Sequence, residues 1–442
     1  MPKVGVPMPG FGVPMPGVGV PMPGVGVPMP KVGVPMPEGG DGNPGDNAGG
    51  STSVEKEEWP AQKPAGALGR SRYICGGGAS FSPTPLPMYT FNPGPAAVYP
   101  AVRQYLTDAY DEGWLSAPHR SEKVTSLVRQ TVADLKTKLN IPQDYTVLFT
   151  GSATECWEVL AQSLTPRRSF HLYNGDFGEK WLRYARALRP ASSGLSFGLD
   201  ELPDIAGLPF SGEDTDLVCI TQNETSTATQ LREGFILNLY NRLGGALLAV
   251  DATSSLAGLN LKYIKADAWF ASVQKCFGLP AGLGVLVLSP RAVAQARLVN
   301  DRAHYNALPA MLAQMLNYQT NYTPNVLGIY LLGRVLADRE PIKAVHQHLA
   351  DRAQKLYDFF EQATPLQPLI ANPETRSTTV IGLKGEPAVI DEIKRKALEA
   401  GLHLGSGYGP LKTTTLRIAN FPAVPDAAFE ALVQFFAKEF PQ

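Results

Sequence analysis

The chain has 442 residues, of which 44% are hydrophobic, and a formal net charge of −1 at pH 7. This length allows more than one domain, and a near-neutral chain without a basic stripe gives no indication of binding to nucleic acid or to an anionic membrane. No run approaches the ~18 to 20 apolar residues that span a bilayer, and the N-terminus lacks the pattern of a secretory signal, so we expect a cytoplasmic protein without a membrane partner.

Residues 1–87 form a low-complexity segment that we expect to be disordered. Between Val4 and Glu38 the sequence repeats every seven residues, as in VGVPMPG at 18–24, and its two prolines per repeat exclude a helical coiled coil. Residues 39–87 continue without a periodic apolar face, as a linker does. Met88 directly precedes the first segment with the character of folded protein. Translation that begins at Met88, an authentic low-complexity tail and a fused tag are therefore three open interpretations.

A large domain is predicted over residues 88–340. Short apolar runs alternate there with amphipathic stretches of helical length, a pattern typical of a mostly parallel sheet with helices on both faces. We expect an α/β fold with seven strands in this sheet. The clearest strands are predicted at 146–149, 170–173, 217–220, 247–250, 268–271 and 285–288, and the clearest helices at 126–139, 154–164 and 235–243.

A smaller C-terminal α/β domain is predicted over residues 341–442, because the pattern changes after Pro341. A long helix at 342–360 is followed by shorter alternating elements. These are strands near 378–381 and 415–418, a helix at 387–400 and a final helix that ends at Phe436.

The turn after the first predicted strand of the large domain has the features of an anion site. Gly151, Ser152, Ala153 and Thr154 join the end of this strand to the start of a helix. Free backbone amides and hydroxyls at a helix N-terminus suit a phosphate group. The alternative is an ordinary strand-to-helix turn that Ser152 or Thr154 caps.

Two further loops follow predicted strands and carry side chains that could contact an aromatic cofactor. Phe177 lies in a glycine-flanked loop, where its ring could stack on a pyridine ring, although most such aromatic residues only pack against the core or its rim. Thr225 lies in a segment dense in hydroxyl and amide groups and could donate a hydrogen bond to a phenolic oxygen. The alternative for Thr225 is a polar loop with local side-chain caps.

Lys275 and Asp251 together indicate pyridoxal phosphate. Asp251 ends the apolar run 247–250, and Lys275 follows the apolar run 268–271, so both residues are expected at the same edge of the sheet. A carboxylate keeps the pyridine nitrogen of this cofactor protonated, and a lysine amine binds its aldehyde as a Schiff base. Either residue alone is unremarkable, because such a lysine is usually solvated and such an aspartate usually caps a turn.

Arginines are better candidates than histidines for binding substrate anions. A planar guanidinium matches a carboxylate or a phosphate with two parallel hydrogen bonds, and Arg120, beside His119, and Arg417 are the two candidates. Either arginine could instead be a surface charge. The remaining histidines and the four cysteines lack metal-ligand spacing, so we predict no metal site, and the cysteines fit a reducing compartment.

From about Met88 to the end, the chain resembles class V aminotransferases, which are pyridoxal phosphate enzymes of fold type I, and most closely those that act on phosphoserine. The resemblance covers about four-fifths of the sequence and rests on the order and spacing of several short motifs. These are FNPGPA at 91–96, HRS at 119–121, GSAT at 151–154, NET at 223–225, DATSS at 251–255, QK at 274–275 and TP at 323–324.

The resemblance implies a role for each candidate residue of the cofactor site. Lys275 would bind pyridoxal 5′-phosphate covalently and carry the proton in transamination, and Asp251 would hold the pyridine nitrogen. Among the other residues, Thr225 would meet the phenolic oxygen, Phe177 would stack on the ring, and the phosphate would be held by Ser152, Ala153 and Gln274.

The resemblance also implies a homodimer with shared active sites. Thr323, with Tyr322 before it, would reach the cofactor phosphate of the neighbouring subunit. His119, Arg120 and Arg417 would hold the anionic groups of amino-acid and keto-acid substrates.

The activity implied is transfer of the amino group from phosphoserine to 2-oxoglutarate in L-serine biosynthesis. Family members with this activity often have an arginine at the position of Ala153, a tryptophan at Phe177 and an asparagine at Tyr322. A related activity on alanine, serine or glyoxylate is the alternative. A protein of another class, in which the repeats have a structural role and the enzyme-like domain is inert, is a more remote alternative that intact Lys275 and Asp251 argue against.

Overall fold

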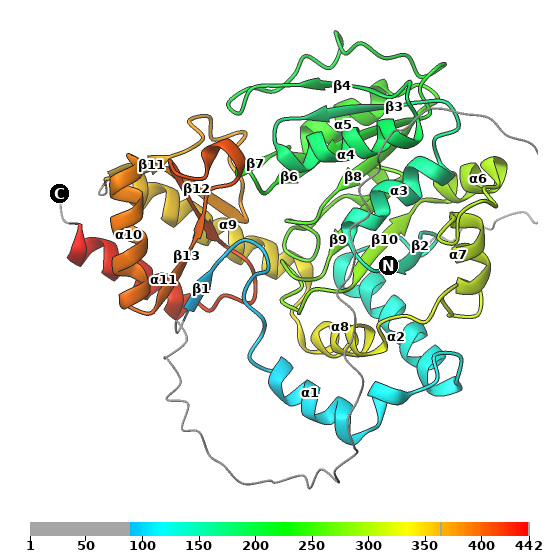
Figure 1. The fold of residues 1–442 in the computed structure, drawn as a ribbon, viewed down its shortest axis with the longest axis horizontal. Helices are drawn as coiled ribbons and strands as arrows, with labels where there is room; N and C mark the ends of the chain where they lie inside the picture. Colours follow the sequence, from blue (N-terminus) through cyan, green and yellow to red (C-terminus); the bar gives the residue numbers. More distant parts are fainter. Residues whose placement is uncertain (1–88, 363–364, 441–442) are drawn as a thin grey trace, which may run out of the picture. The chain divides into compact units, whose positions relative to one another are not determined.

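The computed structural model describes residues 89–362 and 365–440 (Figure 1). The predictions for residues 1–87 and for a start at Met88 lie outside the described residues. None of the helices in the described part of the chain is both long enough and apolar enough to cross a bilayer.

The larger sheet has seven strands, in the order β2-β10-β9-β8-β5-β3-β4. The five strands from β9 to β4 run parallel, whereas β10 is antiparallel to both β9 and β2. The prediction of a mostly parallel seven-stranded sheet is therefore confirmed. The strands are β2 (Thr146–Thr150), β3 (Ser169–Tyr173), β4 (Ser193–Ser196), β5 (Leu217–Thr221), β8 (Leu247–Asp251), β9 (Ala268–Ser272) and β10 (Gly284–Leu288).

Helices cover both faces of this sheet because its strands bury apolar residues on both sides. Alternate residues of β8 show this arrangement. Leu247 and Ala249 pack in the core beneath α3, α4, α6 and α7, whereas Leu248 and Val250 pack in the core beneath α1, α2, α5 and α8. The helices are α1 (Val102–Asp111), α2 (Glu122–Leu139), α3 (Ala153–Ser163), α4 (Asp176–Leu188), α5 (Glu233–Arg242), α6 (Pro290–Val299), α7 (Leu308–Met315) and α8 (Val326–Asp338).

A second sheet of five strands, in the order β1-β13-β14-β12-β11, forms the C-terminal part of the fold. Its first strand, β1, comes from the beginning of the described chain and runs parallel to β13, while the other neighbours are antiparallel. The strands are β1 (Tyr89–Phe91), β11 (Gln367–Pro368), β12 (Val380–Lys384), β13 (Leu402–Ser406) and β14 (Thr415–Ala419).

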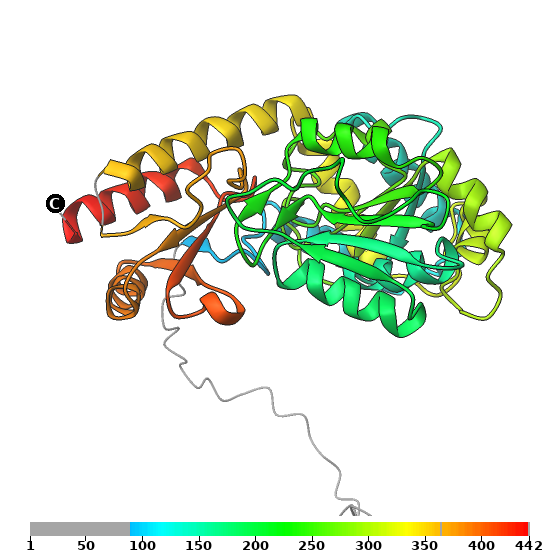
Figure 2. The same cartoon turned by 90° about the horizontal axis from the view of Figure 1, so that it is seen from above.

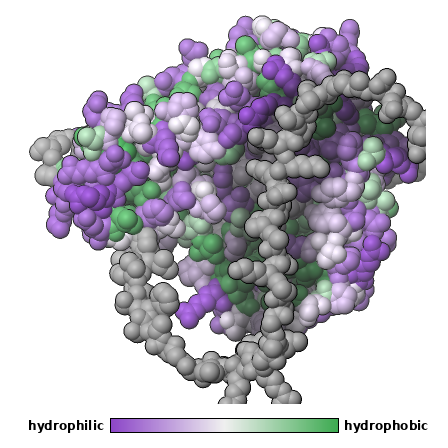
Figure 3. All heavy atoms as spheres, in the orientation of Figure 1, coloured by the Kyte–Doolittle hydropathy of each residue, from purple (hydrophilic) through white to green (hydrophobic). Residues whose placement is uncertain are grey.

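Three helices sandwich this second sheet: α9 (Ile342–Gln362), α10 (Pro387–Glu399) and α11 (Asp426–Glu439). Figure 2 shows α9 and α11 on one face and α10 on the other. Leu356 of α9, Ile393 of α10 and Phe436 of α11 meet in one buried core. Hydrophilic residues cover most of the outer surface of this part in the view of Figure 3, as expected for helices that bury only their apolar stripe.

The carboxyl ends of the central parallel strands meet at one edge of the larger sheet. Thr221 at the end of β5 pairs in register with Asp251 at the end of β8, and Ser272 ends the neighbouring β9. Open α/β sheets bind ligands at this edge. A short hairpin of β6 (Asn223–Glu224) and β7 (Thr229–Gln230) follows β5 there.

Candidate active site

A cavity of about 340 Å³ lies at this edge of the sheet. Its size falls within the range of small-molecule sites in proteins. Seven of the residues that the sequence predicted for a cofactor or substrate site line it: Ala153, Phe177, Thr225, Asp251, Gln274, Lys275 and Arg417.

Lys275 lies in the loop between β9 and β10, and only 6% of its surface is exposed. Its ammonium donates to the hydroxyl oxygens of Thr225 at 2.6 Å and Ser254 at 2.9 Å. Burial lowers the pKa of Lys275 to about 8, although the negative charges of Asp251 and Glu224 oppose this shift. Because a lysine is neutral above its pKa, much more of this amine is neutral near pH 8 than of an exposed lysine.

The amine of Lys275 is expected to titrate near pH 8 in the protein freed of bound aldehydes. Raising the pH through this value should convert the amine to its neutral, nucleophilic form about two pH units earlier than for exposed lysines. Nuclear magnetic resonance of protein with ¹³C-labelled lysine would measure this midpoint, with Lys275→Arg used to assign the signal. A midpoint near 10.5 would contradict the expectation.

Asp251 projects from the end of β8 into the cavity as a buried carboxylate. One carboxylate oxygen accepts hydrogen bonds from Thr253, at 2.9 Å from the backbone nitrogen and 2.5 Å from the hydroxyl, and the other accepts from the indole nitrogen of Trp157 at 3.2 Å. Burial raises the pKa of Asp251, and the two bonds from Thr253 and the charge of Lys275 oppose that rise. A buried carboxylate in this position suits a cationic ring nitrogen.

Trp157 was not predicted from the sequence, although it lines the cavity and contacts Asp251. It lies on α3 four residues after Ala153, and residues with this spacing share one face of a helix. The spacing could have identified Trp157, because Ala153 was already a candidate residue at the start of that helix.

The predicted phosphate turn is the N-terminus of α3. Ser152 caps this helix, because its hydroxyl accepts from the backbone nitrogen of Glu155 at 3.2 Å, and the backbone nitrogen of Ala153 donates to the Ser272 hydroxyl at 2.7 Å. The side-chain oxygen of Gln274 is buried and has no hydrogen-bond partner among the residues that the structure describes. A helix N-terminus beside hydroxyl and amide groups fits a phosphate.

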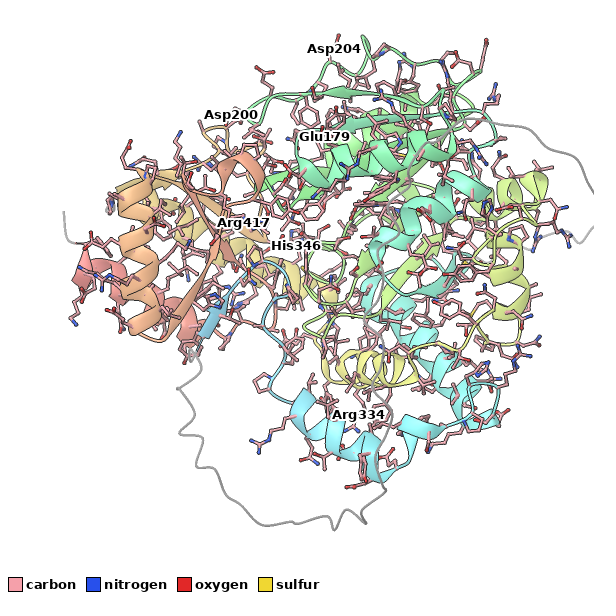
Figure 4. All side chains as sticks on the ribbon, in the orientation of Figure 1. Glu179, Asp200, Asp204, Arg334, His346 and Arg417 are labelled. Carbon is pink, nitrogen blue, oxygen red and sulfur yellow. The ribbon has the colours of Figure 1, made fainter. Side chains whose placement is uncertain are left out.

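Thr225 and Arg417 are joined across the two parts of the fold. The guanidinium of Arg417 donates to the backbone oxygens of Thr225 at 2.7 Å and Ser406 at 2.8 Å, and only 7% of this side chain is exposed. Figure 4 places Arg417 on the C-terminal sheet. A buried cation held in this way at the wall of the cavity can bind a carboxylate.

Phe177 lies in the first turn of α4, not in a loop as the sequence predicted. Its ring centroid is 5.3 Å from the ammonium of Lys275 and 5.3 Å from the ring of Tyr408. Buried Glu224 fixes this turn, since its carboxylate accepts from the backbone nitrogen of Gly178 at 3.1 Å. Helix α4, which was not predicted from the sequence, begins at Asp176 because Gly175 supplies an extended N-cap close to Glu224 and Ser226.

Five predicted site residues do not line this cavity in the single chain: Ser152, His119, Arg120, Tyr322 and Thr323. Arg120 is exposed and donates to the imidazole of His119 at 3.3 Å, in the turn before α2. Thr323 is exposed, and Tyr322 is half-buried beside Tyr305. The single chain does not test the predicted role of Thr323 in a neighbouring subunit or of Arg120 in substrate binding, so both stay predictions.

Gly278 shapes the loop that carries Lys275, and replacing it with alanine is expected to destabilise the protein. Its φ is +64°, and an added Cβ would lie 2.6 Å from the ring of Tyr99 and 2.7 Å from Cβ of Ala423. The left-handed backbone and the overpacking together should cost about 2 to 4 kcal/mol of unfolding free energy. Chemical denaturation would measure the change. Gly234→Ala is the control, because an added Cβ there meets nothing within 4 Å and should be neutral or slightly stabilising.

Comparison with known proteins places this chain in a family. Residues 209–409 match the family of class V aminotransferases. The crystal structure of a phosphoserine aminotransferase from Cytophaga hutchinsonii is similar, with a TM-score of 0.76 and 32% identity, over 79% of this chain and 98% of that chain. This chain belongs to the class V aminotransferases. The predicted family, fold class and transaminase activity are thereby confirmed.

Other aminotransferases are similar to this class V aminotransferase at lower identity. A putative phosphoserine aminotransferase of Mycobacterium leprae is 28% identical over 353 residues, which cover 78% of this chain and 92% of the relative. An alanine–glyoxylate aminotransferase from Nostoc is similar in fold alone, with a TM-score of 0.67 and 18% identity over 78% of this chain and 93% of that chain. The class V fold implies pyridoxal phosphate, and the donor set of the cavity fits this cofactor, with Lys275 for its aldehyde and Asp251 for its ring nitrogen.

Proposed function

We propose that this transaminase uses pyridoxal 5′-phosphate to transfer the amino group of phosphoserine to 2-oxoglutarate, in L-serine biosynthesis. The observation that carries the proposal is the convergence of Lys275 and Asp251 in one buried cavity. The identity of 32% to the Cytophaga hutchinsonii protein supports the choice of phosphoserine. Residues 88–340 would form the cofactor-binding domain of this enzyme and residues 341–442 its smaller domain.

The cofactor would be held by groups of complementary charge. Asp251 would pair with the ring nitrogen, Thr225 would donate to the phenolic oxygen, and Phe177 would stack on the ring. Backbone amides at the start of α3 and polar side chains beside them would hold the phosphate, and residues of a neighbouring subunit would complete its shell. The residues proposed for the phosphate are Ser152, Ala153 and Gln274, with Tyr322 and Thr323 from the neighbouring subunit of a homodimer.

Lys275 would act as the base of the reaction. Bound pyridoxal phosphate supplies an electron sink that stabilises negative charge at the α-carbon of the amino acid. Because burial lowers the pKa of Lys275 to about 8, a substantial fraction of its amine would be neutral near pH 8. This neutral amine would take the proton from the α-carbon and deliver it to the former aldehyde carbon of the cofactor. The hydroxyls of Thr225 and Ser254, which lie 2.6 Å and 2.9 Å from its nitrogen, would keep the amine directed into the cavity.

Two groups of residues would recognise the substrate at its two ends. Arg417 is buried at the wall of the cavity and would bind the α-carboxylate. His119 and Arg120 would bind the phosphate of the substrate. Because these two residues do not line the cavity of their own chain, we propose that they act in the active site of the partner within a cytoplasmic homodimer.

Visible absorption of the purified protein, loaded with pyridoxal phosphate, would test the proposed substrate. The absorption band of lysine-bound cofactor should disappear on titration with phosphoserine and persist with serine or alanine. The control is Arg120→Ala, which should weaken the response to phosphoserine alone. A band lost with serine or alanine but not with phosphoserine would favour the related activity on unphosphorylated amino acids or glyoxylate. Absence of any band would contradict the assignment of the cofactor.

A further inference from the structure

A second cavity, of about 360 Å³, lies apart from the active site. None of its lining residues lines the first cavity. Its walls combine apolar and aromatic side chains with three charged ones, Asp338, Arg339 and Glu340. They come from α1 and the segment before it, the end of α8, the start of α9 and Pro422. Prominent lining residues are Tyr99, Tyr105, Val335, Arg339, Val345 and Leu349. A cavity of this size and composition is typical of small-molecule sites.

Arg339 is the chemically unusual residue of this cavity. It follows the last residue of α8, and only 7% of its surface is exposed. One terminal nitrogen donates to the backbone oxygen of Ala257, whereas Nε and the other terminal nitrogen have no hydrogen-bond partner among residues 89–362 and 365–440. Burying a cation without a counter-charge costs free energy, so an anion bound beside this guanidinium would stabilise it.

The contrast with Arg334, which lies on α8, supports this interpretation. Arg334 lies near α1 (Figure 4), and its guanidinium donates to the carboxylate of Asp108 at 2.9 Å and to the hydroxyl of Tyr330 at 2.6 Å. Arg339 has no ion pair within the part of the chain that the structure describes. The acidic residue beside it, Asp338, accepts a hydrogen bond from the hydroxyl of Tyr105.

We propose that this second cavity binds a small organic anion with an apolar body. The negative group would contact the unpartnered nitrogens of Arg339, after a small displacement of the wall around the buried guanidinium. The apolar body would pack against the side chains of Val335, Val345 and Leu349. Carboxylates of this type match both the single buried cation and the apolar walls, whereas a fully hydrated ion such as inorganic phosphate matches only the cation.

The site adjoins the active site through one segment of chain. Residues 93–95 line the first cavity and residues 99–101 line the second. The backbone nitrogen of Tyr99 donates to the backbone oxygen of Gly278, in the loop that carries Lys275, at 3.0 Å. The bond from Arg339 to Ala257 likewise reaches the segment that carries Ser254, a hydrogen-bond partner of Lys275. A ligand of the second cavity would therefore bind next to the two segments of chain that position Lys275.

Titration of the full-length protein loaded with pyridoxal phosphate would test this proposal by calorimetry, with 4-phenylbutyrate as the probe. The carboxylate should bind, and the uncharged amide 4-phenylbutyramide should bind at least tenfold more weakly. Arg339→Met, which keeps the length of the side chain but removes its charge, should weaken binding of the carboxylate at least tenfold. Arg417→Ala should leave this binding unchanged, because Arg417 belongs to the other cavity.

A second variant keeps the test decisive if Arg339→Met folds poorly. Val345→Phe should fill part of the cavity and weaken binding of both probes while Arg339 stays in place. Thermal unfolding of each variant would verify that it is folded. Equal binding of acid and amide, no saturable binding of the acid, or a loss of binding with Arg417→Ala but not with Arg339→Met would overturn the proposal. None of these results depends on which amino acid the enzyme uses as its substrate.

Discussion

Replacing Lys275 with alanine is expected to lower kcat/KM for transamination by about 10⁴-fold, the upper end of the range for a general acid–base residue. The variant loses the amine that attaches the cofactor and the base that moves the proton. In addition, the hydroxyls of Thr225 and Ser254 lose the group to which they are bound. Steady-state kinetics with saturating pyridoxal phosphate would measure the effect.

The matched control for Lys275 is Lys262→Ala. Lys262 is an exposed lysine that does not line the first cavity, so its removal should leave kcat/KM unchanged. Thermal unfolding of both variants would separate lost chemistry from lost structure. A Lys275→Ala enzyme with more than about one-tenth of the normal activity would contradict the assignment of Lys275 as the base, because general acid–base groups contribute at least ~10²-fold.

Replacing Asp251 with asparagine is expected to lower kcat by about 10²- to 10³-fold, as removal of one preorganised electrostatic group does in other enzymes. The substitution removes the negative charge that faces the cavity while nearly keeping the volume. It also places an amide nitrogen opposite a donor, either the indole nitrogen of Trp157 or the groups of Thr253 that now donate to the carboxylate. Single-turnover rates, with the visible spectrum of the bound cofactor, would measure the loss.

Asp267 provides a control of the same type for Asp251. It is another buried aspartate, before the first residue of β9 and away from the cavity, and its carboxylate accepts from the backbone nitrogen of Leu248 and the hydroxyl of Ser289. Asp267→Asn should lower the unfolding free energy without the large loss of kcat. Similar losses of activity in the two variants would indicate that Asp251 acts through stability and would contradict its proposed role.

Buried parallel strands were the features that the sequence predicted best. Runs such as 247–250 in β8 are apolar on both faces, so the same pattern predicts both the strand and its burial. Strand β4, Ser193–Ser196, lies at the edge of the sheet and has only one large apolar residue, so it has no such pattern. Strand β1 was missed because its position depends on pairing with β13, more than 300 residues later.

Lys275 and Asp251 were predictable as a pair because each follows a recognisable strand, and parallel strands end at one edge of a sheet. Tyr408 and Trp157 were not identified, although both line the cavity. The position of Tyr408 depends on how the C-terminal part packs against α4, where its hydroxyl accepts from the ammonium of Lys180 at 2.8 Å. Such long-range contacts produce no periodic pattern in the sequence, so they could not be predicted from it.

Mass spectrometry of the reduced enzyme would show directly whether Lys275 attaches the cofactor. Borohydride would be added to the protein loaded with pyridoxal phosphate, so that the lysine–cofactor bond becomes a stable amine, and the digested peptides would then be sequenced. We predict that the mass of the reduced cofactor is found on Lys275 and is absent from the same peptide of the Lys275→Arg variant. Attachment to a different lysine, or to none, would show that Lys275 does not bind the cofactor.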